Sequence, residues 1–245
     1  MTDYLKLKLI ILSAHVIAIV GLVSEFEWIG VFASTLLYFW YYGYGMIVGF
    51  HRVFSHKSFE VSATSKWLML ISGSLSAMGS SVGWVGQHRC HHAFSDNPDK
   101  DPYYDKIGLL SKILSWATYA NKPFKLTTVK DLLRDPAHMF VHNNYYKILL
   151  GWVLLLSLIS FKTLVYGWAI PVVMCYTALS LVAVLGHISG PQPHHTNDDS
   201  RDMHLMNIIT LGESYQNYHH LYPSAIIMGK WDIIGIICSK FFKPI

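Results

Sequence analysis

The chain has 245 residues, of which 52% are hydrophobic and only 14% are charged. An average soluble domain has roughly 25% charged residues, so this composition argues against an ordinary water-soluble domain and favours a membrane protein. The net charge is only +4 and the basic residues are scattered, which argues against nucleic-acid binding. The three cysteines, Cys90, Cys175 and Cys238, have no paired spacing, so neither a disulfide framework nor a thiolate zinc site is expected.

Four segments are apolar enough to cross a hydrocarbon core, which takes about 20 helical residues. They are residues 6–23, 28–49, 146–161 and 164–186. We therefore predict an all-α integral membrane protein with four transmembrane helices in two hairpins, in a single domain over residues 1–245. The first apolar run lacks a small-residue cleavage site, so we interpret it as a span rather than a cleaved signal.

The distribution of charge predicts the orientation of these spans. The turn of the first hairpin contains Glu25 and Glu27, whereas Lys6, Lys8 and Arg52 lie at the opposite ends of the same two segments. By the positive-inside rule, the termini and the long middle segment are expected in the cytoplasm. The second hairpin is less clear, because its short turn contains Lys162.

A fifth apolar stretch, Trp67–Val85, is rich in serine and glycine. If it crossed the membrane fully, His51 and His88 would lie on opposite faces. We therefore predict a membrane-embedded or re-entrant helix, which is allowed where protein surrounds the backbone. All histidine-rich segments then form one cytoplasmic cap.

Seven of the fourteen histidines fall in three short boxes. In the first box His51 and His56 are five positions apart, about 140° around an α-helix, so they converge only if the helix unwinds. In the second box His88, His91 and His92 have the i, i+3, i+4 spacing of one helical face.

The third box repeats the spacing of the second, with glutamine in the first place, and a further histidine ends the fourth span. The metal ligands expected from the three boxes and this histidine are His51, His56, His88, His91, His92, His187, Gln216, His219 and His220. A catalytic zinc ion typically takes three protein ligands, so this set is too large for one ion and predicts two redox-active metals.

Metal-bound histidines usually donate their second ring N–H to a carboxylate. Several acidic residues close to the boxes are candidates, and their spacing does not pair them with particular histidines: Asp96, Asp99, Asp101, Asp105, Asp198, Asp199, Asp202 and Glu213.

Three segments together resemble the membrane fatty-acid desaturase family, in its acyl-CoA, delta-9-like branch. They are Gly49–Phe59 (GFHRVFSHKSF), His88–Asp96 (HRCHHAFSD) and Gly212–Pro223 (GESYQNYHHLYP). The resemblance implies two iron ions (Fe2+/Fe3+) as cofactors, O2 as co-substrate and the insertion of a double bond into a fatty acyl chain, with acyl-CoA as the expected substrate. It also implies a separate electron donor, ferredoxin-like or cytochrome b5-like with a reductase, and a lipid bilayer as surroundings.

Two positions depart from the family pattern. Gln216 stands where many relatives have histidine, which implies a weaker ligand on one metal. Ala183 stands four residues before His187, where acyl-CoA desaturases tend to have an asparagine that reaches the metal through water.

Three side chains are candidates for substrate contact. Arg52 and Arg89 either bind an anionic group of the substrate carrier or pair with neighbouring aspartates. Phe39, with Tyr42 and Met46, either closes the acyl tunnel or packs against helices and lipid. The remaining histidines, His15, His138, His142, His204 and the pair His194 and His195, are expected to be surface or loop residues.

Two other functions are compatible with these boxes. The same type of site could hydroxylate or ketolate an acyl chain. A histidine-rich metal transporter is the alternative from another class, although its ionisable residues would be expected near the middle of the membrane.

Overall fold

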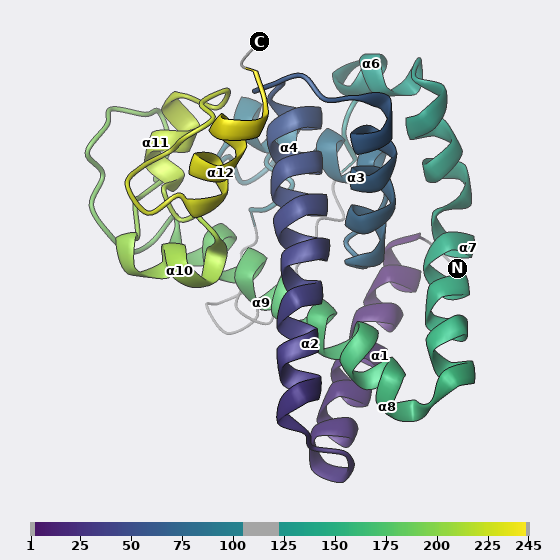
Figure 1. Ribbon diagram of the computed structural model, residues 1–245. Coiled ribbons are helices and arrows are strands. Elements are labelled where there is room, and N and C mark those ends of the chain that lie inside the picture. The colour runs from purple at the N-terminus through teal and green to yellow at the C-terminus, as the bar shows by residue number, and fades with distance from the viewer. Residues whose placement is uncertain (1–2, 105–122, 244–245) are drawn as a thin grey trace.

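The computed structural model describes residues 3–104 and 123–243, and the described residues form helices joined by loops (Figure 1). The first hairpin consists of α1 (Asp3–Ser24) and a continuous helix made of α2 (Trp28–Tyr38) and the π-helix η1 (Phe39–Ser55). The second consists of α7 (Pro136–Ile159) and a continuous helix made of α8 (Phe161–Leu164), η3 (Val165–Ala169) and α9 (Ile170–Leu185).

The remaining helices are short and lie between or after these hairpins. They are α3 (Ala63–Leu75), α4 (Ser81–Phe94), η2 (Leu126–Val129), α6 (Lys130–Leu133), η4 (His204–Met206), α10 (Asn207–Thr210), α11 (Gln216–Leu221) and α12 (Ile233–Phe241). In Figure 1, α10, α11 and α12 gather into a cap beside one end of the α2–η1 helix.

Within the described residues, two helices are long and apolar enough to cross a membrane: Leu5–Ser24 and Phe161–Leu185. The segment 28–49 and most of 146–161 are helical too, but the helices that contain them are not apolar enough over a full span. Four tyrosines interrupt the first of them, and α7 carries His142, Asn143, Asn144 and Lys147 in its first half. Four transmembrane helices therefore remain a prediction.

The turns of the two hairpins meet at one end of the molecule. Lys162 Nζ lies 2.6 Å from Glu27 Oε1 and 3.8 Å from Glu25 Oε2. The Tyr166 hydroxyl donates to the Glu25 carbonyl at 2.7 Å. Lys162, which left the orientation of the second hairpin unclear from sequence, is therefore paired with the acidic turn of the first hairpin.

The stretch Trp67–Val85 is not one helix. It breaks between α3 and α4, where Ala77 (φ 63°) and Gly79 (φ 97°) have left-handed backbone conformations. The Gly79 N–H donates to the Tyr145 hydroxyl, and the Tyr176 hydroxyl donates to the Ala77 carbonyl. Because these partners satisfy the buried backbone, the chain can reverse here inside the protein.

Helices α3 and η1 approach closely through glycine. A Cβ atom on Gly45 would lie 2.3 Å from the backbone nitrogen of Gly73, and one on Gly73 would meet the Phe50 ring at 2.5 Å. This contact positions the end of η1, which carries the first histidine box.

Candidate metal centre

The first histidine box lies on a π-helix, in which hydrogen bonds connect residues five apart. The His56 N–H donates to the His51 carbonyl at 3.2 Å, and the Ser55 hydroxyl donates to the Phe50 carbonyl. The rings of His51 and His56 are therefore close, with centroids 4.9 Å apart. The expectation that the helix must unwind is confirmed, because the π-helix turns through a smaller angle per residue than an α-helix and so brings position i+5 beside position i.

Five histidines form a first group whose ligand nitrogens all lie within 4.8 Å of one another: His51, His56, His88, His92 and His219. Their Nε2 atoms face each other. The Nε2–Nε2 separations are 2.9 Å for His51–His219, 2.8 Å for His56–His88, 3.1 Å for His88–His92 and 2.9 Å for His92–His219. Nitrogen atoms that converge in this way suit a shared metal ion.

Burial favours the neutral form of four of these five rings. Burial, together with the neighbouring histidines, lowers the pKa of His56, His88, His92 and His219 well below the ordinary value. Neutral imidazole is the form that binds a metal.

Three histidines form a second group: His91, His187 and His220. In each, Nδ1 contacts an aspartate, at 3.0 Å for His91–Asp101, 3.0 Å for His187–Asp96 and 2.6 Å for His220–Asp198. These contacts leave the three Nε2 atoms for a metal, which is the usual carboxylate–histidine–metal arrangement.

The second and third boxes each supply both groups. On α4, His88 and His92 belong to the first group and His91 to the second, so the three rings of this box do not share one target. On α11, His219 and His220 divide in the same way. Adjacent positions on an α-helix differ by about 100° in direction, so their rings reach different groups and each box links the two groups.

The residues present fit a pair of metal ions. The Nε2 atom of His187 is buried and has no hydrogen-bond partner among the described residues, and a buried polar atom without a partner is costly. Gln216 is buried beside the second group, and its Nε2 lies 3.0 Å from His220 Nε2. The amide of Gln216 is therefore close enough to this group to take part in it.

A buried ion-pair network supports the first group. His51 Nδ1 lies 2.5 Å from Glu213 Oε2, as a close contact rather than an aligned hydrogen bond. Arg52 pairs with Glu213 at 2.7 Å and with Asp232 at 3.0 Å, and it also donates to the Ile226 carbonyl. Burial alone would raise the pKa of Glu213, but its contacts with Arg52 and His51 lower it to about 2.

Arg52 and Arg89 are both engaged with protein groups. Arg52 is fully buried, so the expectation that it binds a substrate carrier is wrong; it pairs with carboxylates, one of which, Asp232, lies outside the expected set. Arg89 contacts both oxygens of Asp131 and donates to the carbonyls of Phe54 and Ser55. Both arginines therefore tie the boxes together.

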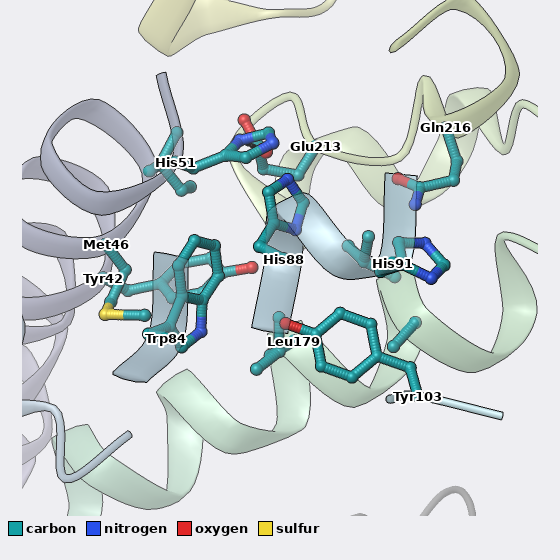
Figure 2. A pocket seen from close by; sticks show the side chains of 13 residues that line it. Tyr42, Met46, His51, Trp84, His88, His91, Tyr103, Leu179, Glu213 and Gln216 are labelled. Atoms are coloured by element: carbon teal, nitrogen blue, oxygen red, sulfur yellow. Dashed lines mark ion pairs between the residues drawn. The ribbon is translucent and has the colours of Figure 1, made fainter. Parts of the chain in front are cut away.

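An apolar cavity adjoins the histidines (Figure 2). Figure 2 shows Tyr42, Met46 and Trp84 on one side of it and Leu179 and Tyr103 on another, with His51, His88 and His91 above them. The Trp84 ring is stacked on His88, with centroids 4.9 Å apart.

Two of the three residues considered for the acyl tunnel line this cavity. Tyr42 and Met46 line it, but Phe39 does not, and 45% of the Phe39 side chain is exposed on the outside of the helix. The expectation that Phe39 closes the tunnel is therefore wrong, because its position on η1 faces away from the cavity. Ala183 lines the cavity, so the missing asparagine leaves apolar surface there.

Sequence reasoning misjudged some supporting residues. His138 is buried and hydrogen-bonded to Ser81, so it stabilises the start of α4 rather than lying on the surface; His142 is exposed, as expected, and is hydrogen-bonded to Ser80. Asp202 accepts from the backbone of Asn217 and Tyr218 and so caps α11 instead of supporting a histidine. Asp105 lies outside the described residues.

Trp84 and Asp232 were missed. Trp84 lies four positions before His88, one helical turn away, and this spacing was a signal that could have been used. Asp232 is remote from every box in sequence, and no local pattern marks it.

The structure thus defines a class of protein: a helical protein with two adjoining groups of buried histidines above an apolar cavity. A family model described as fatty acid desaturase matches residues 26–225. The chain therefore belongs to the fatty acid desaturase family, whose members are oxidoreductases.

Several curated relatives are similar over most of this chain. The sn-1 stearoyl-lipid 9-desaturase of Anabaena variabilis is 30% identical over 232 residues, which cover 92% of this chain and 85% of the relative. Delta-9 acyl-lipid desaturase 1 of Arabidopsis thaliana is 32% identical over 200 residues, covering 79% and 65% respectively. A probable acyl-CoA desaturase of Schizosaccharomyces pombe is 28% identical over 200 residues, covering 78% and 42%.

Proposed function

We propose that this protein catalyses the O2-dependent desaturation of a fatty acyl chain and inserts a cis double bond at a delta-9-like position. The observation that carries the proposal is the contact between the apolar cavity and both histidine groups, since His51, His88 and His91 line the cavity. The delta-9 position is supported by the printed names of the relatives.

The two histidine groups would each hold one iron ion. His51, His56, His88, His92 and His219 would hold the first, and His91, His187 and His220, with Gln216, would hold the second. When bound, the irons supply the oxidising power that removal of hydrogen from an unactivated carbon requires, with O2 and external electrons.

The protein's own contribution is position and exclusion of water. Trp84, Tyr42 and Met46 form a wall that holds an aliphatic chain beneath the histidines. Orientation of the reacting bond next to the oxidant is the main effect that a rigid cavity can supply. The buried pairs of His91, His187 and His220 with aspartates keep those rings oriented before substrate arrives.

The head of the acyl carrier would occupy a second cavity. This cavity shares Trp84 with the first and is lined by Lys6, Lys8, Gln87 and His142, among others. Its basic and amide side chains suit a phosphate group, as in CoA or a phospholipid, and the relatives' names include both acyl-lipid and acyl-CoA desaturases. Assays with an acyl-CoA and with a phospholipid carrying the same acyl chain distinguish the two carriers.

We also propose that residues 1–245 form one multi-pass membrane domain with four spans and the metal centre on the cytoplasmic side. The paired turns at Glu27 and Lys162 lie at one end, and Lys6 and Lys8 lie at the other end of α1. Apolar side chains on α1 and α7 are exposed, for example Ile19 (63%) and Leu158 (76%), as expected of surfaces that face lipid.

Expression in a desaturase-deficient host tests the activity. We expect new double bonds in the host lipids, mapped by mass spectrometry, and none with His219→Ala. Hydroxylated or ketolated acyl chains without new double bonds would favour the alternative reaction at the same site. Metal flux in vesicles without any lipid product would favour a transporter.

The electron donor is tested with purified protein. We expect repeated turnover only when a ferredoxin-like or cytochrome b5-like protein and its reductase are added. Repeated turnover with O2 alone would contradict the need for a separate donor.

A further inference from the structure

In the segment from η4 to α10, residues 204–210, two polar side chains are buried and three large apolar side chains are exposed, and His204 at its start is exposed too. Asn207 and Thr210 are fully buried, whereas Leu205, Ile208 and Ile209 are 86%, 70% and 51% exposed. This pattern is the reverse of what a segment facing water shows.

The buried polar groups have defined roles, which makes the inverted pattern a stable feature of the fold. Asn207 Oδ1 accepts from the Ser214 N–H, and its Nδ2 donates to the His204 carbonyl at 3.2 Å. The hydroxyls of Thr210 and Ser214 are 2.6 Å apart. Rotation of the segment to bury the isoleucines would expose these groups and break their bonds.

Residues 204–211 lie against the middle of the α2–η1 helix. The Tyr38 hydroxyl donates to the Ile209 carbonyl, and Leu211 packs beside Gly43. Tyr38 is ten positions beyond Trp28, where α2 begins, which corresponds to about 15 Å along an α-helix. If the α2–η1 helix spans the bilayer, this point lies about halfway through a hydrocarbon core of roughly 30 Å.

We infer that residues 204–210 face the acyl chains of the bilayer, so that the C-terminal cap is partly inserted in the membrane and is not entirely cytoplasmic. Figure 1 shows α10 at the edge of the cap, in contact with α9. Apolar side chains of the neighbouring helix α2 are exposed as well, with Phe32 at 64% and Leu36 at 56%. The inference rests on the proposed placement of the long helices in the membrane.

Photo-crosslinking of the full chain in vesicles tests this contact. The probe is a phosphatidylcholine with a diazirine on its acyl chain, and crosslinked peptides are identified by mass spectrometry. We expect labelling of residues 204–210 at a yield similar to that of residues 16–23 on α1, where Val16, Ile19 and Val23 are exposed. The exposed loop at residues 190–199 should be labelled much less.

A matched pair of variants sharpens the test. A double variant, Leu205→Glu with Ile208→Glu, should reduce labelling of 204–210 by about tenfold or more, because charged side chains are costly in hydrocarbon. Leu126→Glu changes an equally exposed apolar residue (65%) on η2 and should leave that labelling unchanged.

Two results would overturn the inference. One is the absence of acyl labelling in 204–210 while α1 is labelled, and the other is crosslinking of this segment to a second copy of the chain in place of lipid. Desaturation is measured separately in the same vesicles. A labelled segment in an inactive protein would contradict the proposed function alone. An unlabelled segment in an active protein would contradict this inference alone.

Discussion

Arg52 and Glu213 form a buried ion pair, with Nη2 of the arginine 2.7 Å from Oε1 of the glutamate. The pair joins the first histidine box to the third, because Arg52 follows His51 and Glu213 begins the segment that leads to His219. Asp232, next to α12, contacts the same guanidinium at 3.0 Å. The C-terminal segment is therefore tied to the metal centre through one arginine.

Asp232→Asn should destabilise the protein strongly. The substitution removes one of the two buried carboxylates that pair with Arg52 and weakens the bonds that Asp232 accepts from the Met228 and Gly235 N–H groups, and breaking a buried pair costs about 3 kcal/mol or more. We expect a large fall in the thermal unfolding midpoint in detergent. Lys57→Met removes the exposed Lys57–Asp131 pair and should change stability little; a similar effect of both variants would contradict the importance of the buried network.

Asp198→Asn should weaken the second metal site. Asp198 orients His220 through a 2.6 Å contact, and loss of such a partner typically reduces metal affinity by about 10–100-fold. The measurement is iron content after dialysis against a graded chelator. Asp199→Asn is the control, because Asp199 is exposed and contacts Asp96 through its backbone N–H; equal iron loss in both variants would argue against the proposed pairing.

Gln216 can be tested as a ligand by two substitutions. If its amide completes the second group, Gln216→Ala should lower the iron content towards one ion per chain, whereas Gln216→His should keep two and bind them more tightly. Mössbauer spectra of iron-57 protein report the change at one site only. Two tightly held irons in Gln216→Ala would show that the side chain is a hydrogen-bonding neighbour of His220 and not a ligand.

Gly45→Ala should disturb the first histidine box through helix packing. The added Cβ would lie 2.3 Å from the Gly73 backbone nitrogen, so α3 and η1 must separate. Overpacking of this kind costs about 1–3 kcal/mol, occasionally more, and we expect a lower unfolding midpoint with reduced iron binding. Gly151→Ala, where nothing lies within 4 Å, should be neutral or stabilising.

The contact between Arg89 and Asp131 predicts a dependence of stability on acid. The Arg89 guanidinium lowers the pKa of Asp131 from 3.8 to about 2. The stabilisation by this pair is therefore complete above about pH 4 and is lost as the pH falls through 2, so it does not change between pH 5 and 8. Asp131→Asn should lower stability at neutral pH and remove this acid-dependent part, as measured by unfolding at a series of pH values.

The sequence alone determined the class of protein and most members of the two histidine groups. The spacing of His88 and His92 places them one helical turn apart whatever surrounds them, and the apolar composition of residues 6–23 predicts a long helix that the structure confirms in α1. Local spacing is sufficient here because both features depend only on the geometry of one helix.

The tertiary structure decided which histidines belong to which of the two groups and which residues support them. His91 and His92 are neighbours in sequence but belong to different groups, and His51 reaches His56 only because η1 is a π-helix. The pairing of Arg52 with Asp232, and the exposure of Phe39 away from the cavity, depend on how distant helices pack. Such contacts arise between segments far apart in the chain, so no local pattern in the sequence specifies them.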